Sequence, residues 1–318
     1  MNPPYEITTK ILHLVNEISE KVGAINIINL NIPSPTLRKE NRIKTIQSSL
    51  AIEGNTLSVK QITAVLEGKR IVAPNKDILE VKNAIKVYEN LEKYNPNKLS
   101  DLCKAHKVLM KNLDNDAGKL RTKSVGIVKG DELAHLAPSG SMVKSLMNNL
   151  FSYLKKSDDL TLIKSCVFHY ELEFIHPFMD GNGRMGRLWQ TLVLSSSNSV
   201  FSFLPIESLI KQRQDEYYNA LGKSDKIGQS TPFIEFMLVV ISDALSVVLG
   251  AQNKTITNTD RIEIFRLAIK ENTFGRKEYL SKFKTISTAT ASRDLKVAVE
   301  KGVLKKIGTQ NKTTYQFC

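Results

Sequence analysis

A glycine-rich loop between two apolar segments of helical length constrains this chain most strongly. Leu162–Ile175 and Leu188–Leu194 are both rich in apolar residues, and residues 176–187 between them read HPFMDGNGRMGR. Glycines at the start of a helix let backbone N–H groups converge on an anion, and the helix dipole favours negative charge there. The sequence therefore predicts a helix, an anion-binding loop and a second helix in succession.

The polar side chains of this loop suit a nucleotide. Arg184 and Arg187 are three residues apart, so they project from one side of the helix and suit a ligand with several phosphate groups. Asn182 adds a neutral donor, and Asp180 is a hard oxygen ligand suited to Mg²⁺. His176 can accept a proton near neutral pH. These residues predict a site for phosphoryl or nucleotidyl transfer.

Two other site patterns in this region are incomplete. Gly181, Gly183 and Gly186 fit the dinucleotide-binding spacing G-x-G-x-x-G, but that pattern requires a preceding strand in a βαβ unit. The upstream segment is helical, so a dinucleotide fold is not expected. Cys166 and His169 share a helix face, but no second Cys/His pair lies nearby in the sequence, so a zinc cluster is not expected either.

Helical periodicity extends over most of the first 250 residues. Residues 233–249 are apolar enough to form a buried helix. A stripe near the N-terminus consists of Leu12, Val15, Ile18 and Val22. One stretch differs, because residues 124–128 are rich in β-branched side chains and are followed by the turn residues Lys129–Asp131 and by residues 134–138. This stretch predicts a small β-hairpin on a helical body.

Composition narrows the class of protein. Hydrophobic residues make up 42% of the chain, enough for a packed core. No apolar run is expected to reach the roughly 18 residues that span a bilayer, and the N-terminus lacks a signal-peptide layout. The three cysteines have no framework spacing and are expected to be reduced. These features predict a cytoplasmic protein with no membrane partner.

The C-terminal segment is basic and has its own pattern. From residue 254 onward it carries 14 Lys/Arg and 6 Asp/Glu, a net of +8 out of +13 for the chain. Such a segment suggests an acidic partner such as DNA. Its sequence predicts three helices and a hairpin, with helices around Ile262–Ile269, over Arg276–Phe283 and from the N-cap Ser287 to about Lys301, and strands over 304–307 and 313–317.

Three helices and a hairpin in this order predict a winged helix-turn-helix domain. The third helix of such a domain lies in a major groove. The side chains expected to face outward on it, and to contact DNA, are Thr288, Thr290, Arg293 and Lys296. Lys305, Lys306 and Lys312 could reach phosphates from the hairpin. The same kind of domain also serves as a protein-docking surface, so DNA and protein both stay open as partners.

Residues 176–187 resemble the signature of the Fic family, H-P-F-x-[DE]-G-N-G-R-x-x-R, at every defined position. The resemblance covers roughly residues 35–250. It implies a Fic-type helical bundle with a small β-hairpin flap. It also implies an enzyme that moves AMP from ATP onto a Ser, Thr or Tyr hydroxyl of a target protein and releases pyrophosphate. Mg²⁺ is the implied cofactor, and a homodimer is a further implication, since family members often dimerise.

The resemblance also assigns roles to the loop. His176 would deprotonate the target hydroxyl and Asp180 would bind Mg²⁺. Gly181–Gly183, with the Asn182 side chain, would hold the α- and β-phosphates, while Arg184 would contact the β-phosphate and Arg187 the γ-phosphate.

Two further groups of residues resemble parts of the family's site. Residues at the predicted hairpin lie where the family has a flap that pairs with the main chain of the target peptide. They are Val125, Gly126, Ile127 and Val128. Tyr217 and Tyr218 resemble a tyrosine pair that lies near the nucleotide in relatives.

An N-terminal segment resembles the family's inhibitory pattern, [ST]-x-x-x-E-[GN], through Ser49, Glu53 and Gly54. It ends an expected helix at about residues 37–54. The resemblance implies that Glu53 pairs with Arg187 and competes with the γ-phosphate of ATP. Gly54 would let the chain turn sharply after the helix.

The sequence thus predicts a mainly α protein with an N-terminal helical region over residues 1–95, a Fic core over 96–250 and a winged helix-turn-helix domain over 255–318. Two alternatives stay open. In the first, the chain is a DNA-binding transcriptional regulator whose core senses a nucleotide. In the second, it is a Fic enzyme that transfers or removes another nucleotidyl group. Relatives with Ala-Asn-Lys in place of Gly-Asn-Gly can act as kinases, and Gly181 and Gly183 favour AMP transfer instead.

Overall fold

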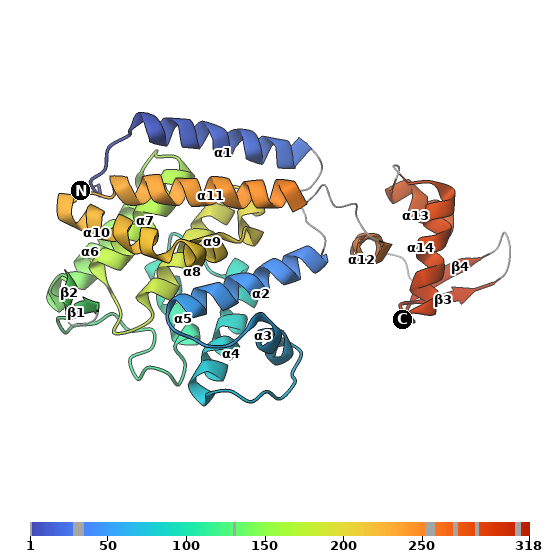
Figure 1. Cartoon of the computed structure of the whole chain (residues 1–318), viewed down its shortest axis with the longest axis horizontal. Coiled ribbons are helices and arrows are strands. Elements are labelled where there is room, and N and C mark those ends of the chain that lie inside the picture. The colour runs from blue at the N-terminus through green and yellow to red at the C-terminus, as the bar shows by residue number, and fades with distance from the viewer. Residues whose placement is uncertain are drawn as a thin grey trace. The chain divides into compact units, whose positions relative to one another are not determined.

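The computed structural model describes residues 2–27, 35–129, 132–251, 258–269, 273–283, 286–308 and 313–318. The chain is mainly helical (Figure 1). It divides into two compact units, a larger one of residues 1–32 and 40–249 and a smaller one of residues 33–39 and 250–318. The expected turn residues 130–131 and Lys312 lie outside the described residues.

The larger unit is a bundle of helices with one hairpin. Its elements are α1 (Thr9–Ile27), α2 (Pro35–Ile52), α3 (Val59–Leu66), α4 (Asn75–Glu89), the 3₁₀ turn η1 (Leu91–Lys93), α5 (Leu99–Leu109), β1 (Gly126–Lys129), β2 (Glu132–Leu136), α6 (Gly140–Lys156), α7 (Thr161–Ile175), α8 (Asn182–Ser195), η2 (Ser199–Phe203), α9 (Ile206–Gln212), α10 (Gln214–Ile227) and α11 (Thr231–Ala251).

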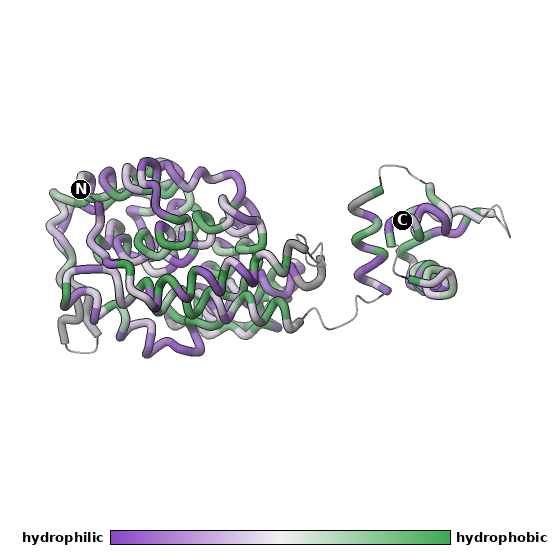
Figure 2. Tube along the Cα trace, turned by 90° about the horizontal axis from the view of Figure 1, so that it is seen from above, coloured by the Kyte–Doolittle hydropathy of each residue, from purple (hydrophilic) through white to green (hydrophobic). Residues whose placement is uncertain are grey.

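Hydropathy alternates along most of these helices, as amphipathic packing requires (Figure 2). In α1 the buried face coincides in part with the predicted stripe. Ile18 is buried and Val15 and Val22 pack against the core, whereas Leu12 is 60% exposed and Ile11 and Ile25 are buried instead. Spacing alone predicts a helix, and only the neighbouring helix decides which of two adjacent stripes is buried.

The neighbour of α1 is α11, and the two lie side by side (Figure 1). Lys21 Nζ donates to Ser242 Oγ at 2.8 Å, and Thr8 Oγ1 donates to Glu235 Oε1 at 2.7 Å. Contrary to the expectation that no apolar run is long enough, α11 meets the length and hydropathy of a membrane span. It is also a core helix, because 56% of that apolar window is buried within the protein.

The predicted hairpin is present as β1 and β2, which pair antiparallel from Gly126↔Leu136 to Lys129↔Glu132. The register shifts between Ile127 and Val128, as at a β-bulge. The strand β1 begins two residues after the start of the predicted stretch 124–128. The strand β2 begins two residues before the start of the predicted stretch 134–138.

The smaller unit contains the predicted three helices and a hairpin. They are α12 (Asn258–Ala268), α13 (Arg276–Lys282), α14 (Thr288–Glu300), β3 (Leu304–Ile307) and β4 (Thr314–Phe317). Ser287 caps α14 as expected, since its Oγ accepts the N–H of Thr290 at 3.1 Å. Gly302, just past the helix, has a φ of 71°, the left-handed conformation that ends helices.

A buried ion pair joins the helices of the smaller unit. Arg261 donates from Nε and Nη2 to Asp294 at 2.6 and 2.9 Å, and the Tyr279 hydroxyl donates to Asp294 at 3.2 Å. Asp294 is 2% exposed. This fork connects α12, α13 and α14 through one carboxylate, so removing the carboxylate would remove the hydrogen bonds that join all three helices.

We therefore expect Asp294→Ala to destabilise the smaller unit by about 3–5 kcal/mol. Glu300→Ala is the control, because its contact with Lys296 is long, at 3.8 Å, and exposed, and such pairs contribute about 0–1 kcal/mol. Hydrogen exchange of the α14 amides in the full chain measures the loss of stability in each variant. Equal protection in the two variants would contradict the structural role of Asp294.

Candidate functional site

Two left-handed residues shape the loop between α7 and α8. His176 caps the end of α7 with a φ of 49°, and its N–H donates to Leu172 O at 2.9 Å. Gly181 has a φ of 80° and immediately precedes α8. A Cβ at Gly181 would lie 2.8 Å from Met110 Sδ, so only glycine fits this turn. The first N–H groups of α8 have no intrahelical acceptor, so they are available to an anion at this end of the helix.

The Asn182 side chain closes the loop on itself. Its Nδ2 donates to Phe178 O and its Oδ1 accepts from Phe178 N, both at 2.9 Å. The ring of Phe178 stacks on His106 with centroids 3.7 Å apart. His106 Nε2 in turn lies 2.9 Å from Asp180 O. The Asn182 amide, predicted as a phosphate donor, is thus used to hold the loop, and His106 holds the loop from α5.

Arg121 is a second residue that sequence patterns did not identify. It is 4% exposed and precedes the hairpin. Its Nε donates to His176 O at 2.6 Å, and its Nη2 donates to Ile175 O at 2.9 Å and Pro138 O at 2.7 Å. A cation at a helix C-terminus stabilises the last carbonyl groups. Arg121 therefore ties the end of α7 to both sides of the hairpin.

Arg187 pairs with the segment that resembles the inhibitory pattern. Its Nη2 lies 2.7 Å from Glu53 Oε1, and its Nε and Nη2 donate to Ser49 Oγ and Ser49 O at 3.2 and 3.0 Å. Burial opposes the charge of the guanidinium, but the Glu53 carboxylate outweighs burial and raises the pKa of Arg187. Gly54 then turns the chain with a φ of 89°. The predicted contact between Glu53 and Arg187 is present.

Arg184 has carboxylate partners of its own. Its Nη1 lies 3.3 Å from Glu80 Oε1 on α4, and its Nη2 lies 3.1 Å from Asp180 Oδ1. The Asp180 side chain is 60% exposed, so it can still reach a ligand in solvent. Within the described residues, no group of three or more His, Cys, Asp or Glu side chains is placed to hold a metal ion. A single exposed carboxylate fits Mg²⁺ that takes its other ligands from phosphates and water.

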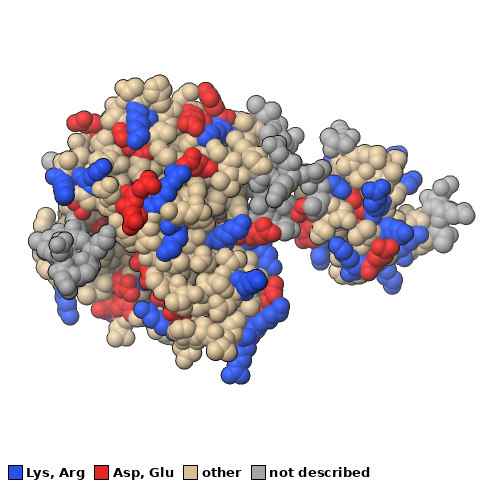
Figure 3. Space-filling view, in the orientation of Figure 1, with Lys and Arg blue, Asp and Glu red and all other residues tan. Residues whose placement is uncertain are grey.

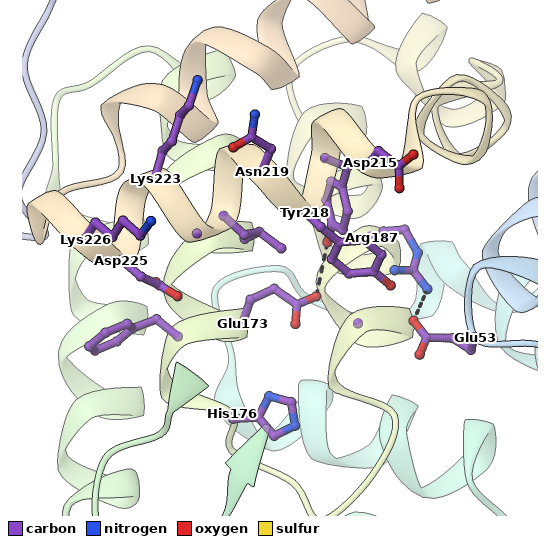
Figure 4. Close-up of a pocket in the computed structure, with 15 residues that line it drawn as sticks. Glu53, Glu173, His176, Arg187, Asp215, Tyr218, Asn219, Lys223, Asp225 and Lys226 are labelled. Carbon is purple, nitrogen blue, oxygen red and sulfur yellow. Dashed lines mark hydrogen bonds and ion pairs between the residues drawn. The ribbon is translucent and has the colours of Figure 1, made fainter. Parts of the chain in front are cut away.

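A pocket of about 500 Å³ brings together Glu53, His176 and Arg187 (Figure 4), whereas Asp180 and Arg184 are not among its lining residues. Its lining includes Glu53, Glu173, His176, Gly183, Arg187, Asp215, Tyr217, Tyr218, Asn219, Lys223, Asp225 and Lys226. The volume is in the range of small-molecule sites. The structure therefore brings the predicted base, one predicted arginine, the tyrosine pair and the predicted inhibitory carboxylate to one cavity.

Glu173 is a charged residue that lines this pocket and that the sequence patterns did not identify. The hydroxyl of Tyr217, itself buried, donates to Glu173 Oε1 at 3.3 Å. Burial would raise the pKa of the Glu173 carboxyl, but His169, with His176 and Arg187, outweighs burial and lowers it. Glu173 lies on α7, three residues before His176 at the end of that helix. This spacing could have indicated that the two side chains face the same side of the helix.

The remaining predicted residues fall into two places. The hairpin lies beside the pocket, because β2 contacts α10, which carries Tyr217 and Tyr218. Val125 is partly buried, while the side chains of Gly126, Ile127 and Val128 lie outside the described residues. The suggested DNA contacts belong to the smaller unit, where Thr288, Arg293 and Lys296 are exposed and Thr290 is partly exposed.

Comparisons with known proteins find relatives of this chain in sequence and in fold. Residues 96–194 match the Fic/DOC family. A crystal structure of a Fic family protein from Desulfovibrio desulfuricans is 38% identical, with a TM-score of 0.77 over 100% of this chain and 98% of that one. Protein adenylyltransferase fic-1 of Caenorhabditis elegans is 26% identical over 79% of this chain and 49% of its own.

Protein adenylyltransferase Fic of Aedes aegypti is 30% identical over 74% of this chain and 48% of its own. The chain therefore spans about half the length of the curated relatives it matches.

Close packing behind the loop gives a test of the site's rigidity. A Cβ at Gly186 would lie 2.6 Å from His169 Cδ2, and His169 is fixed by Gln190 at 2.7 Å and Tyr217 at 3.1 Å. We expect Gly186→Ala to destabilise the protein by about 1–3 kcal/mol. Denaturant unfolding with far-UV circular dichroism measures this change.

Gly222→Ala is the matched control on α10. A Cβ there meets nothing within 4 Å, and alanine is favoured over glycine in a helix by about 0.5–1 kcal/mol. The control should therefore be slightly more stable than the wild type. Equal stability of Gly186→Ala and Gly222→Ala would contradict the tight contact between α8 and His169.

Proposed function

This chain belongs to the Fic family, and from that premise we propose that it is a protein adenylyltransferase that moves AMP from ATP onto a hydroxyl of a target protein. The observation that carries the proposal is the shared pocket. His176, Gly183, Arg187 and the tyrosines Tyr217 and Tyr218 line one cavity of nucleotide size at the start of α8. Relatives that match most of this chain are named protein adenylyltransferases.

The proposed reaction needs a base, and His176 is the base in the pocket. Its imidazole would take the proton from the target hydroxyl as the hydroxyl oxygen attacks the α-phosphorus of ATP. A bond forms between that oxygen and phosphorus, and the bond from phosphorus to the pyrophosphate oxygen breaks. Arg121 and Asn182 would keep the imidazole in place, because they fix the backbone on either side of it.

The triphosphate would occupy the N-terminal end of α8. The unpaired N–H groups of its first turn suit the α- and β-phosphates, and the forked guanidinium groups of Arg184 and Arg187 suit the β- and γ-phosphates. Mg²⁺, if held by Asp180, would offset the charge of these phosphates. Arg184 and Arg187 would then exchange carboxylate partners for phosphate oxygens.

That exchange is the basis of the second part of the proposal, in which Glu53 inhibits the enzyme. Glu53 Oε1 lies 2.7 Å from Arg187 Nη2, and a Cβ at Gly183 would lie 2.6 Å from the same oxygen. The Glu53 carboxylate therefore stands at the start of α8, where a γ-phosphate would need to be. Both anions cannot use this position at once because like charges repel.

The hairpin of β1 and β2 is the proposed dock for the target. A strand edge offers unpaired N–H and C=O groups to an extended peptide. Because β2 contacts α10 beside the pocket, a peptide added at this edge would bring a hydroxyl near His176 (Figure 4). Main-chain pairing depends little on the side chains of the target peptide. The type of residue that is modified therefore depends on which hydroxyl side chain fits between the hairpin and His176.

For the smaller unit we propose a winged helix-turn-helix that binds DNA. Its helices and hairpin occur in the order that this fold requires. Figure 3 shows Lys and Arg side chains gathered on the face of this unit that is in view. Arg293 and Lys296 are exposed on α14, and Lys306 is exposed on β3. Basic side chains on a helix and a wing suit the groove and the phosphates respectively.

The transfer proposal is tested with ATP labelled on the α-phosphate. We expect Glu53→Gly to increase label on protein by roughly 10- to 100-fold, because one charge-assisted hydrogen bond is worth about 1.5–3 kcal/mol. Adding His176→Ala to that variant should lower the rate by about 10²–10⁴-fold. A cell lysate serves as the source of target.

Glu67→Gly is the matched control, because Glu67 is an exposed carboxylate at the end of α3 whose ion pair with Lys69 lies on the surface. It should leave the rate unchanged. If Glu53→Gly takes up no more label than Glu67→Gly, the inhibitory role is wrong. If no variant transfers label, AMP transfer itself is wrong.

The DNA proposal is tested by a gel shift over a range of salt concentrations. We expect Arg293→Ala with Lys296→Ala to weaken binding and to reduce the salt slope by about 1.8, from two lost phosphate contacts. His176→Ala should bind DNA like the wild type. A protein–DNA affinity that does not change with salt or with the double substitution would contradict this role.

A further inference from the structure

A second cavity of about 480 Å³ lies beside α2, separate from the pocket around His176. None of its lining residues lines the first pocket. Its buried lining combines polar side chains from four helices with apolar side chains. The buried polar residues are Thr45, Tyr88, Thr191 and Glu207, the buried apolar ones include Leu91, Leu192, Phe203 and Leu204, and the exposed rim includes Arg42, Glu89, Glu92, Ser196, Ser199 and Ser202.

Glu207 is the distinctive residue of this cavity. It is 1% exposed, and its Oε2 has no hydrogen-bond partner among the described residues. Its Oε1 accepts from the Tyr88 hydroxyl at 3.3 Å. No ion pair within the described part of the chain involves Glu207, but the Thr45 side chain hydrogen-bonds to its carboxyl group and the charge of Arg187 acts to lower its pKa. Burial raises the pKa of its carboxyl to about 7. A buried carboxyl group with an unused oxygen is costly unless a partner satisfies it.

The rim indicates the charge of that partner. Glu89 and Glu92 add two carboxylates, and Arg42 adds one guanidinium, so the acidic groups outnumber the basic group. The chain as a whole carries +13, so an acidic cavity is a local departure from its surface. Serine and threonine hydroxyls also line the cavity and can accept further N–H groups.

From these observations we propose that this cavity binds a small organic ammonium ligand, with the ammonium group on Glu207 Oε2 and the rest of the ligand along the hydroxyls of the rim. The N⁺–H group would donate to the unused carboxylate oxygen, and a charge-assisted hydrogen bond of this kind is among the stronger ones. The cavity volume fits a ligand of up to moderate size. An anion is disfavoured because it would face three carboxyl groups.

The test is isothermal titration calorimetry of the full chain with putrescine, with 1,4-butanediol as the neutral isostere and succinate as the anionic one. We expect putrescine to bind with a stoichiometry of one, and the other two probes to show no binding. Glu207→Gln keeps the shape of the side chain and should weaken putrescine binding by about 10- to 100-fold.

Two further variants keep the test independent of folding. Ser199→Trp places a large side chain on the exposed rim and should abolish binding without touching the core. Glu216→Gln, at an exposed carboxylate on α10 away from this cavity, should bind like the wild type. Circular dichroism checks that each variant is folded.

Wild-type protein that does not bind putrescine, or Glu207→Gln that binds it as well as the wild type does, would overturn the proposal. So would butanediol or succinate binding as tightly as putrescine. Because these titrations measure binding alone, their outcome does not depend on whether the chain transfers AMP.

Discussion

The buried guanidinium of Arg187 is the constraint on which the arrangement of this molecule most depends. Arg187 is 2% exposed, and a buried cation is tolerated only when it is paired and hydrogen-bonded. Ser49 and Glu53, one turn apart on α2 and just after it, supply both kinds of partner. The N-terminal helix α2 is therefore held against the start of α8, although more than 130 residues separate the two partners in sequence.

Other contacts support the same placement of α2. Three polar groups on or after α9 bond to its C-terminal end, at Ser48, Ala51 and Ile52. The last carbonyl groups of a helix lack the usual intrahelical donor, and here Lys211 and Gln214 donate to two of them, at Ala51 and Ile52. The position of Glu53 is thus determined by the end of its helix as well as by Arg187.

The helix α2 contributes to both cavities. Glu53 lines the pocket around His176, while Arg42 and Thr45, two to three turns earlier, line the pocket around Glu207. The first pocket combines a base, a guanidinium and helix N–H groups, which suits a polyphosphate. The second combines carboxyl groups and hydroxyls, which suits a cation. The two cavities therefore differ in the cationic groups available to a ligand, since the first is lined by Arg187, Lys223 and Lys226 and the second by Arg42 alone.

The sequence by itself determined the local features. The glycine turn before α8, the serine cap of α14 and the terminal hairpin depend on residues within a few positions of each other, so their patterns could be read directly. The resemblance of residues 49–54 and 176–187 to family patterns added the pairing of Glu53 with Arg187. The tertiary structure alone decided which face of α1 is buried and how His106, Arg121 and Glu207 are used. Each of these depends on partners far along the chain, and hydrogen bonds and burial across such distances leave no periodic trace in the sequence.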